Sequence, residues 1–144
     1  DGLAQIAADP AQSEDARLGA IEALADVRDP RAVPRLIPLL GDRSAEIGKL
    51  VHWALTVLAR SDLGRDPRAW HEWWRDNGVR HRIEWLIDAL MNDSSEIRRA
   101  AGDELKTITR EYFGYYDDLP QRERAKAQKK YREWWDTKGK ARFH

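Results

Sequence analysis

The sequence predicts an all-α fold, an α-solenoid of helix pairs with added third helices. Three observations predict it. Apolar residues recur at helical spacings of three and four, and no segment alternates with a period of two. Residues that favour helix N-termini precede the periodic segments. The periodic pattern also returns at a fixed interval along the chain, as expected for stacked repeats.

The interval between copies is 50 residues. Segment 35–47 matches segment 85–97, with leucine, isoleucine, serine and glutamate at equivalent positions. AWHEWWRDNG matches KYREWWDTKG at an interval of 61, which places an 11-residue insertion near 115–125. A shorter copy precedes both. We therefore expect one domain of three repeats, at about 1–27, 29–78 and 80–139.

Capping residues and apolar stripes set the expected helices. Asp29, followed by Pro30, caps a helix that stops at Gly41, and Ser44 and Ser94 cap the second helices of the two long copies. We expect a short helix at Leu3 and Ile6, helices at about 13–27, 31–40, 44–60, 67–77, 80–91, 94–113 and 121–138, and a loop at 114–120. The inward stripe of the 94–113 helix is Ile97, Ala101, Leu105, Ile108 and Tyr112.

Composition narrows the class of protein. The chain has 25 basic and 25 acidic residues, so it is neither a globally basic nucleic-acid binder nor an acidic tail protein. Its 42% hydrophobic content excludes a disordered chain. The absence of cysteine excludes disulfides, thiolate catalysis and cysteine-bound zinc. No apolar run approaches the length of a membrane span, so we expect no membrane insertion.

The first residues, DGLAQIAADP, lack both an initiator Met and the basic start of a signal peptide. We expect a fragment of a longer protein. The compartment stays open between bacterial cytoplasm and periplasm.

The segment DPRAVPRLIPLLGDRSAEI, preceded by ARLGAIEALADV, resembles a bacterial HEAT repeat. The Asp-Pro start, the Leu-Ile-x-x-Leu-Leu stripe and the pattern of Arg17, Ala20, Ala23 and Leu24 correspond to that family. The resemblance covers 13–58 and 83–108, and the middle copy departs from it with Gly48 in place of the arginine. It implies antiparallel helix pairs whose second helices line a concave interaction surface.

Each third helix contains an aromatic box, and the two boxes are Trp70, Trp73, Trp74 and Tyr131, Trp134, Trp135. We expect both boxes to pack against their own helix pairs, because a packing role must recur in both copies. An aromatic platform for a peptide, sugar or base is the alternative.

Trp53 lies about 120° from Ile47 around its helix, outside the apolar stripe. It is either wedged against a neighbouring helix or exposed to a partner. In the second case it forms one ridge with basic residues of both copies. We assign this ridge as the candidate partner-binding surface: Lys49, Trp53, Arg60, Arg99, Lys106 and Arg110.

The sequence contains no catalytic pattern. His71-Glu72 resembles the start of a zinc-protease motif, but Arg75 stands where the second histidine is needed. Phosphate loops, nucleophile elbows and paired-carboxylate motifs are absent, and Asp117-Asp118 fits a solvated turn. We expect structural or solvated roles for the four histidines, His52, His71, His81 and His144. We assign no catalytic, metal-binding or cofactor-binding residue and expect a non-enzymatic protein without a cofactor.

The segment 121–144 has nine basic and three acidic residues. It can neutralise phosphates or an acidic partner, or form a solvated face against the acidic middle of the chain. Some HEAT-like proteins bind DNA, including an alkylpurine glycosylase branch. We expect a protein-interaction or scaffolding module with a protein partner. The alternative is nucleic-acid binding through the last helix.

Overall fold

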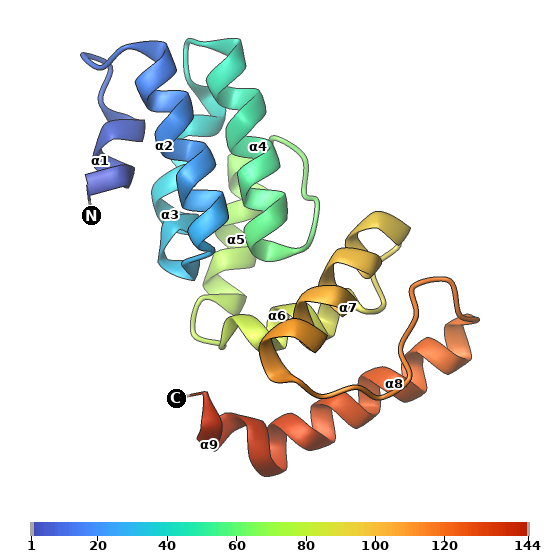
Figure 1. Ribbon diagram of the computed structural model, residues 1–144. Coiled ribbons are helices and arrows are strands. Elements are labelled where there is room, and N and C mark those ends of the chain that lie inside the picture. The colour runs from blue at the N-terminus through green and yellow to red at the C-terminus, as the bar shows by residue number, and fades with distance from the viewer. Residues whose placement is uncertain (1, 144) are drawn as a thin grey trace. The chain divides into compact units, whose positions relative to one another are not determined.

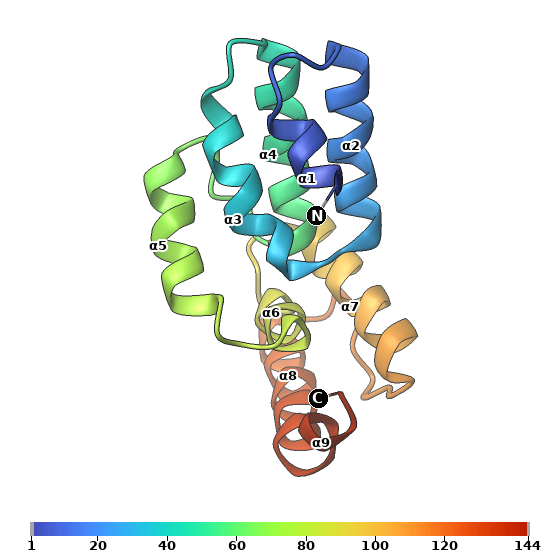
Figure 2. The same ribbon diagram turned by 90° about the vertical axis from the view of Figure 1, so that its left-hand side faces the viewer.

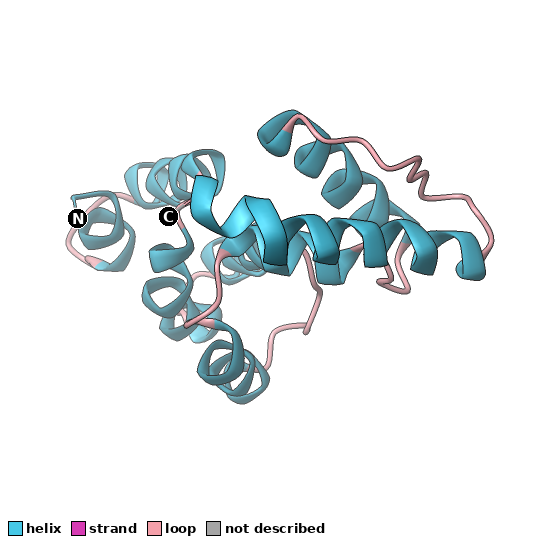
Figure 3. Cartoon of the chain, turned by 90° about the horizontal axis from the view of Figure 1, so that it is seen from below, coloured by secondary structure: helices cyan, strands magenta, loops and turns pink. Residues whose placement is uncertain are grey.

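The computed structural model describes residues 2–143, and these form helices and loops without a strand (Figure 3). The all-α prediction is therefore confirmed. Within the described residues, no helix combines the length and the apolar character needed to cross a bilayer.

The chain divides into two compact units, one ending at Val79 and the other beginning at Arg80 (Figure 1). The division falls between the second and third expected repeats. The first unit contains α1 (Gly2–Ala8), α2 (Glu14–Val27), α3 (Val33–Leu36), α4 (Ala45–Ala59) and α5 (Pro67–Asn77). The second contains α6 (Arg82–Ala89), α7 (Ser95–Thr109), α8 (Gln121–Trp134) and α9 (Lys140–Arg142).

Helix starts follow the predicted caps. The Asp29 side chain accepts from the Arg31 N–H, the Ser44 hydroxyl from the Ile47 N–H, and the Ser94 hydroxyl from the Ile97 N–H. Each bond satisfies a backbone donor that has no partner within the helix.

The expected 31–40 helix is not one continuous α-helix. Its residues form a 3₁₀ turn at Pro30–Ala32, α3, and a second 3₁₀ turn at Ile37–Gly41. Pro34 and Pro38 have no N–H, so the α-helical bonds to the carbonyls four residues earlier are missing. The tighter 3₁₀ turns keep the segment helical without those bonds.

In the first unit, α2 and α4 lie side by side, and α3 with its following turn packs between α4 and α5 (Figure 2). The stripe of α4 is fully buried at Ile47, Val51 and Leu55, as the periodicity predicts. Arg17 on α2 links two other segments of this unit. Its guanidinium donates to the Ala7 carbonyl at 3.0 Å and to the Asp42 carboxylate at 2.6 Å. The bond from Arg17 keeps the pKa of the Asp42 carboxyl below its usual value.

In the second unit, α6 packs against both α7 and α8. Its core contains Leu86, Leu90, Ala101 and Leu105 together with the second aromatic box. The buried guanidinium of Arg82 also pairs with the Glu104 carboxylate within this unit.

The end of α7 differs from the prediction. The helix stops at Thr109 rather than near Phe113 because the Thr109 hydroxyl donates to the Leu105 carbonyl and accepts from the Glu111 N–H. Two residues expected to face inward are exposed, one at the last turn of the helix and one beyond its end. Ile108 is 38% exposed and Tyr112, now in the loop, is 50% exposed.

The insertion is not simply an exposed loop. Tyr115 is buried, and its hydroxyl donates to the Leu90 carbonyl at 2.7 Å. The Arg98 guanidinium donates to the Asp117 carbonyl at 3.0 Å. These bonds fasten the loop to the ends of α6 and α7. As predicted, residues after Pro120 begin the last helix, which extends past Lys138 through a π-helical turn into α9.

Both aromatic boxes anchor the loop that precedes them. The Trp70 Nε1 donates to the Gly64 carbonyl at 2.8 Å, and the Tyr131 hydroxyl donates to the Glu111 carbonyl at 2.9 Å. All three residues of the second box are buried, as expected. In the first box only Trp70 is buried, and its partners, Trp73 and Trp74, are partly exposed.

Candidate partner-binding surfaces

A groove of about 560 Å³ is lined by α2 and α4 of the first unit. Leu18, Glu22 and Asp26 line it from α2 at spacings of four residues, which places them on one face of the helix. The α4 wall consists of Glu46, Lys49, Leu50 and Trp53. The groove is thus formed by two parallel stripes of side chains that the core does not use.

Trp53 is the most exposed of the groove's apolar side chains, at 47%. It lies outside the buried stripe of α4, as its angular position predicts. Lys49, one turn earlier on the same helix, lines the same groove and is exposed. The structure therefore brings two of the predicted partner-binding residues together on one open surface.

The other predicted residue of this unit, Arg60, ends α4 in the left-handed conformation with φ of 51°. Arg28 and Arg110 end α2 and α7 in the same way. A non-glycine residue with positive φ is uncommon, and its recurrence at three helix ends marks the same turn in each copy.

The predicted residues of the second unit lie along α7 and at its end. The Arg99 Nε lies 3.6 Å from an Asp117 oxygen, and the Lys106 Nζ lies 5.5 Å from the centre of the Tyr112 ring. Arg110 is exposed. The predicted ridge is thus observed as two sets, with Lys49, Trp53 and Arg60 in one unit and Arg99, Lys106 and Arg110 in the other.

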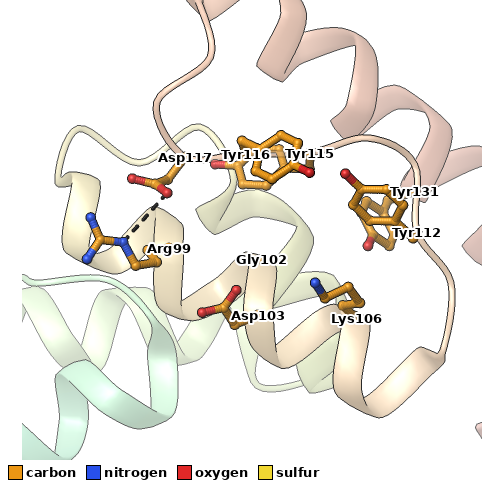
Figure 4. A pocket seen from close by; sticks show the side chains of 9 residues that line it. All are labelled: Arg99, Gly102, Asp103, Lys106, Tyr112, Tyr115, Tyr116, Asp117 and Tyr131. Carbon is orange, nitrogen blue, oxygen red and sulfur yellow. Dashed lines mark ion pairs between the residues drawn. The ribbon is translucent and has the colours of Figure 1, made fainter.

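A small pocket of about 60 Å³ adjoins Arg99 and Lys106, beneath the tyrosines of the 110–120 loop (Figure 4). The Tyr112 and Tyr116 rings pack edge to face, with centres 6.2 Å apart. Tyr112 is held in its protonated form by the hydrogen bond that it shares with Tyr116, in which its own hydroxyl donates, and this raises the pKa of Tyr112. The pocket accommodates one or two water-sized groups rather than a cofactor.

Sequence reasoning missed both the exposed tyrosines and the acidic wall of the groove. Tyr112 is expected within a helix that in the structure ends before it, whereas Tyr116 lies in the expected loop at 114–120. The signal for the acidic wall was present, because Glu22 and Asp26 are spaced by four residues outside the apolar stripe of α2.

Two of the described histidines, His52 and His81, form hydrogen bonds within the fold. The His52 Nε2 lies 2.7 Å from an Asp62 oxygen, and this bond lowers the pKa of the Asp62 carboxyl. The His81 Nδ1 accepts from the Ile83 N–H at 3.0 Å and caps α6. His71 is exposed on α5, and His144 lies outside the described residues. Over 2–143, no group of three histidine or acidic side chains is arranged to hold a metal ion.

The basic last helix is partly neutralised. Arg132 pairs with Asp88 of α6 at 2.8 Å, and Lys126 lies 3.5 Å from Glu123. Six cations of segment 121–143 form no ion pair with any described residue: Arg122, Arg124, Lys129, Lys130, Lys138 and Arg142.

Comparisons with protein-family models, with curated proteins and with solved structures find no match to this chain. The fold and the surfaces described above are therefore the basis for any functional assignment.

Proposed function

We propose that this chain is a non-enzymatic protein-interaction module of HEAT-repeat type, an α-solenoid that acts as a scaffold for a protein partner. The observation that supports it best is the exposed indole of Trp53 in the groove between α2 and α4. Tryptophan and arginine are the residues that most often anchor protein interfaces. About half of the Trp53 surface is exposed in the groove, and a partner could bury this remaining apolar area.

The test is capture of a partner from the native host by the wild-type protein and by a Trp53→Ala variant. We expect one specific protein to be recovered with the wild type and lost with the variant. Tyr116→Ala is the matched control, because it removes an exposed aromatic side chain from the other unit. Circular dichroism of each variant checks that the helices are intact. Retention of the partner by Trp53→Ala would contradict the assignment of this groove.

Arg99→Glu tests the second set of predicted residues separately. Loss of the partner with Arg99→Glu, but not with Trp53→Ala, would move the interaction to α7 and the tyrosines of the 110–120 loop.

Nucleic-acid binding through α8 is the second candidate, and the cations of segment 121–143 that form no ion pair with a described residue favour it. Binding to phosphates releases counterions, so affinity would fall steeply as salt rises. The test is a mobility-shift assay with DNA and RNA at about 50 mM salt. We expect retarded species to disappear on Lys129→Glu with Lys130→Glu, and the absence of any retarded species would exclude this function.

A further inference from the structure

The groove between α2 and α4 combines carboxylates on one wall with an indole on the other. We propose that it binds a short basic segment of a partner protein, with an arginine side chain against Trp53 and paired with Glu22 and Asp26. This rests on the proposed function, since it names the class of segment that the interaction surface accepts.

The register of the two helices places these groups at one level. The Ser44 hydroxyl at the start of α4 donates to the Glu14 carboxylate at the start of α2, so the two helices begin side by side. Both then rise by about 1.5 Å per residue. Glu22 lies eight residues beyond Glu14, and Trp53 lies nine residues beyond Ser44. The carboxylate and the indole therefore face the same stretch of groove.

The carboxylates of the groove are available to a ligand. Neither Glu22, Asp26 nor Glu46 forms an ion pair with another residue of the described chain, and all three are exposed. Lys49 is the one cation among the lining residues. The groove is thus net negative although the chain as a whole is neutral.

Arginine fits this arrangement better than lysine. A guanidinium is planar, so one face can stack on an indole while its N–H groups donate to a carboxylate in the same plane. A lysine ammonium can satisfy only one of these contacts well. Leu18 and Leu50 are half-buried in the same groove and offer apolar contact to the residue next to the arginine.

The length of the groove limits the segment. From Leu18 to Asp26 the α2 wall extends about 12 Å, which spans about two helical turns or four extended residues. A short segment with alternating basic and apolar residues therefore matches both the length and the chemistry.

The experiment uses the full chain and a labelled hexapeptide of alternating arginine and leucine, with lysine–leucine and glutamate–leucine peptides for comparison. Fluorescence anisotropy at about 0.15 M ionic strength measures affinity. The ¹⁵N-indole resonance of Trp53 reports the site. We expect the arginine peptide to move this resonance and to bind more tightly than the lysine peptide. Glu22→Gln with Asp26→Asn should weaken its binding by about tenfold or more.

The matched control is Glu72→Gln with Glu133→Gln, which changes the net charge equally at exposed positions on α5 and α8. An equal loss with this control would mean that only net charge matters and would overturn the site. Comparable binding of the glutamate peptide, or an unmoved Trp53 resonance, would also overturn it.

A second copy of this chain is the competing occupant, because segment 121–144 is itself basic. Sedimentation over a range of concentrations tests this. A dimer that Glu22→Gln with Asp26→Asn converts to monomer would assign the groove to self-association and overturn the partner segment.

The two levels of proposal fail separately. If capture from the host depends on Trp53 but the arginine peptide does not bind there, the proposed interaction module is supported. The groove then binds a partner segment that is not basic. If the peptide binds at Trp53 while capture is insensitive to Trp53→Ala, the groove accepts basic segments but the proposed function falls.

Discussion

Tryptophan side chains at different positions of this chain have different roles, and exposure separates them. Trp53 is 47% exposed, whereas Trp134 is 7% exposed within the core of its unit. Helical periodicity predicts both positions, because Trp53 falls outside its apolar stripe and Trp134 falls on one. Periodicity alone does not reveal the acidic wall opposite Trp53, since that depends on which helix lies beside α4.

We therefore expect Trp134→Ala to lower the free energy of unfolding by about 3–5 kcal/mol, since it removes a large buried ring and leaves a cavity. Trp53→Ala should change it by less than about 1 kcal/mol. Urea denaturation of both variants measures the difference. A larger loss with Trp53→Ala than with Trp134→Ala would mean that Trp53, rather than Trp134, packs in the core.

Two buried phenols should make stability depend on pH. Burial raises the pKa of Tyr115 and of Tyr131 to about 12, against about 10 in the unfolded chain. Below pH 10 both states keep these protons, so the stabilisation is complete. Between about pH 10 and 12 only the unfolded state releases them. The free energy of unfolding should then fall by up to roughly 1.4 kcal/mol per pH unit for each tyrosine.

Urea melts at a series of alkaline pH values measure this slope. Tyr115→Phe with Tyr131→Phe serves as the comparison, because it removes both titrating groups while keeping the rings. The double variant starts less stable, since it loses two hydrogen bonds, and its slope should be shallower. An unchanged slope would contradict the assignment to these phenols.

At the scale of elements, the 50-residue interval seen in the sequence is also the interval between the boundaries of α4 and those of α7. Helix α4 covers Ala45–Ala59 and α7 covers Ser95–Thr109, and each ends at a left-handed arginine. Caps and stripes were predictable because they depend on local sequence. Pro34 and Pro38 were also a local signal for the 3₁₀ turns, although the apolar stripe alone predicts a continuous helix. The early end of α7 was not predictable, because it depends on which backbone groups the Thr109 hydroxyl bonds.

The glycine that ends each aromatic box is required by a close approach. A Cβ on Gly139 would lie 2.7 Å from the Trp134 ring and 2.8 Å from the Trp135 ring. Both rings are buried and cannot move aside. We therefore expect Gly139→Ala to lower the free energy of unfolding by about 1–3 kcal/mol.

Gly19→Ala is the matched control, because Gly19 lies within α2 and a Cβ there meets nothing within 4 Å. This control should raise stability by up to about 1 kcal/mol, since alanine favours a helix more than glycine does. Chemical denaturation of both variants measures the pair. Equal effects of the two substitutions would mean that the aromatic rings do not restrict Gly139.

At the scale of the molecule, each unit has its own set of buried side chains. Leu55 is fully buried in the first unit, and Trp134 belongs to the core of the second. A chain with a separate core in each unit can open one unit without the other. In a single continuous stack, a core substitution would instead destabilise the neighbouring helices along the array as well.

Native-state hydrogen exchange distinguishes these behaviours. We expect Trp134→Ala to lower the protection of α6 and α8 amides more than that of α2 and α4 amides. Leu55→Ala should produce the opposite pattern, because it leaves a cavity in the first unit. If either substitution lowered protection equally in both units, the chain would unfold as one cooperative array. In such an array, a partner bound at the groove of the first unit would raise the amide protection of α6 and α8 as much as that of α2 and α4. If the units unfold separately, the bound partner would raise protection only in the helices of the first unit, up to α5.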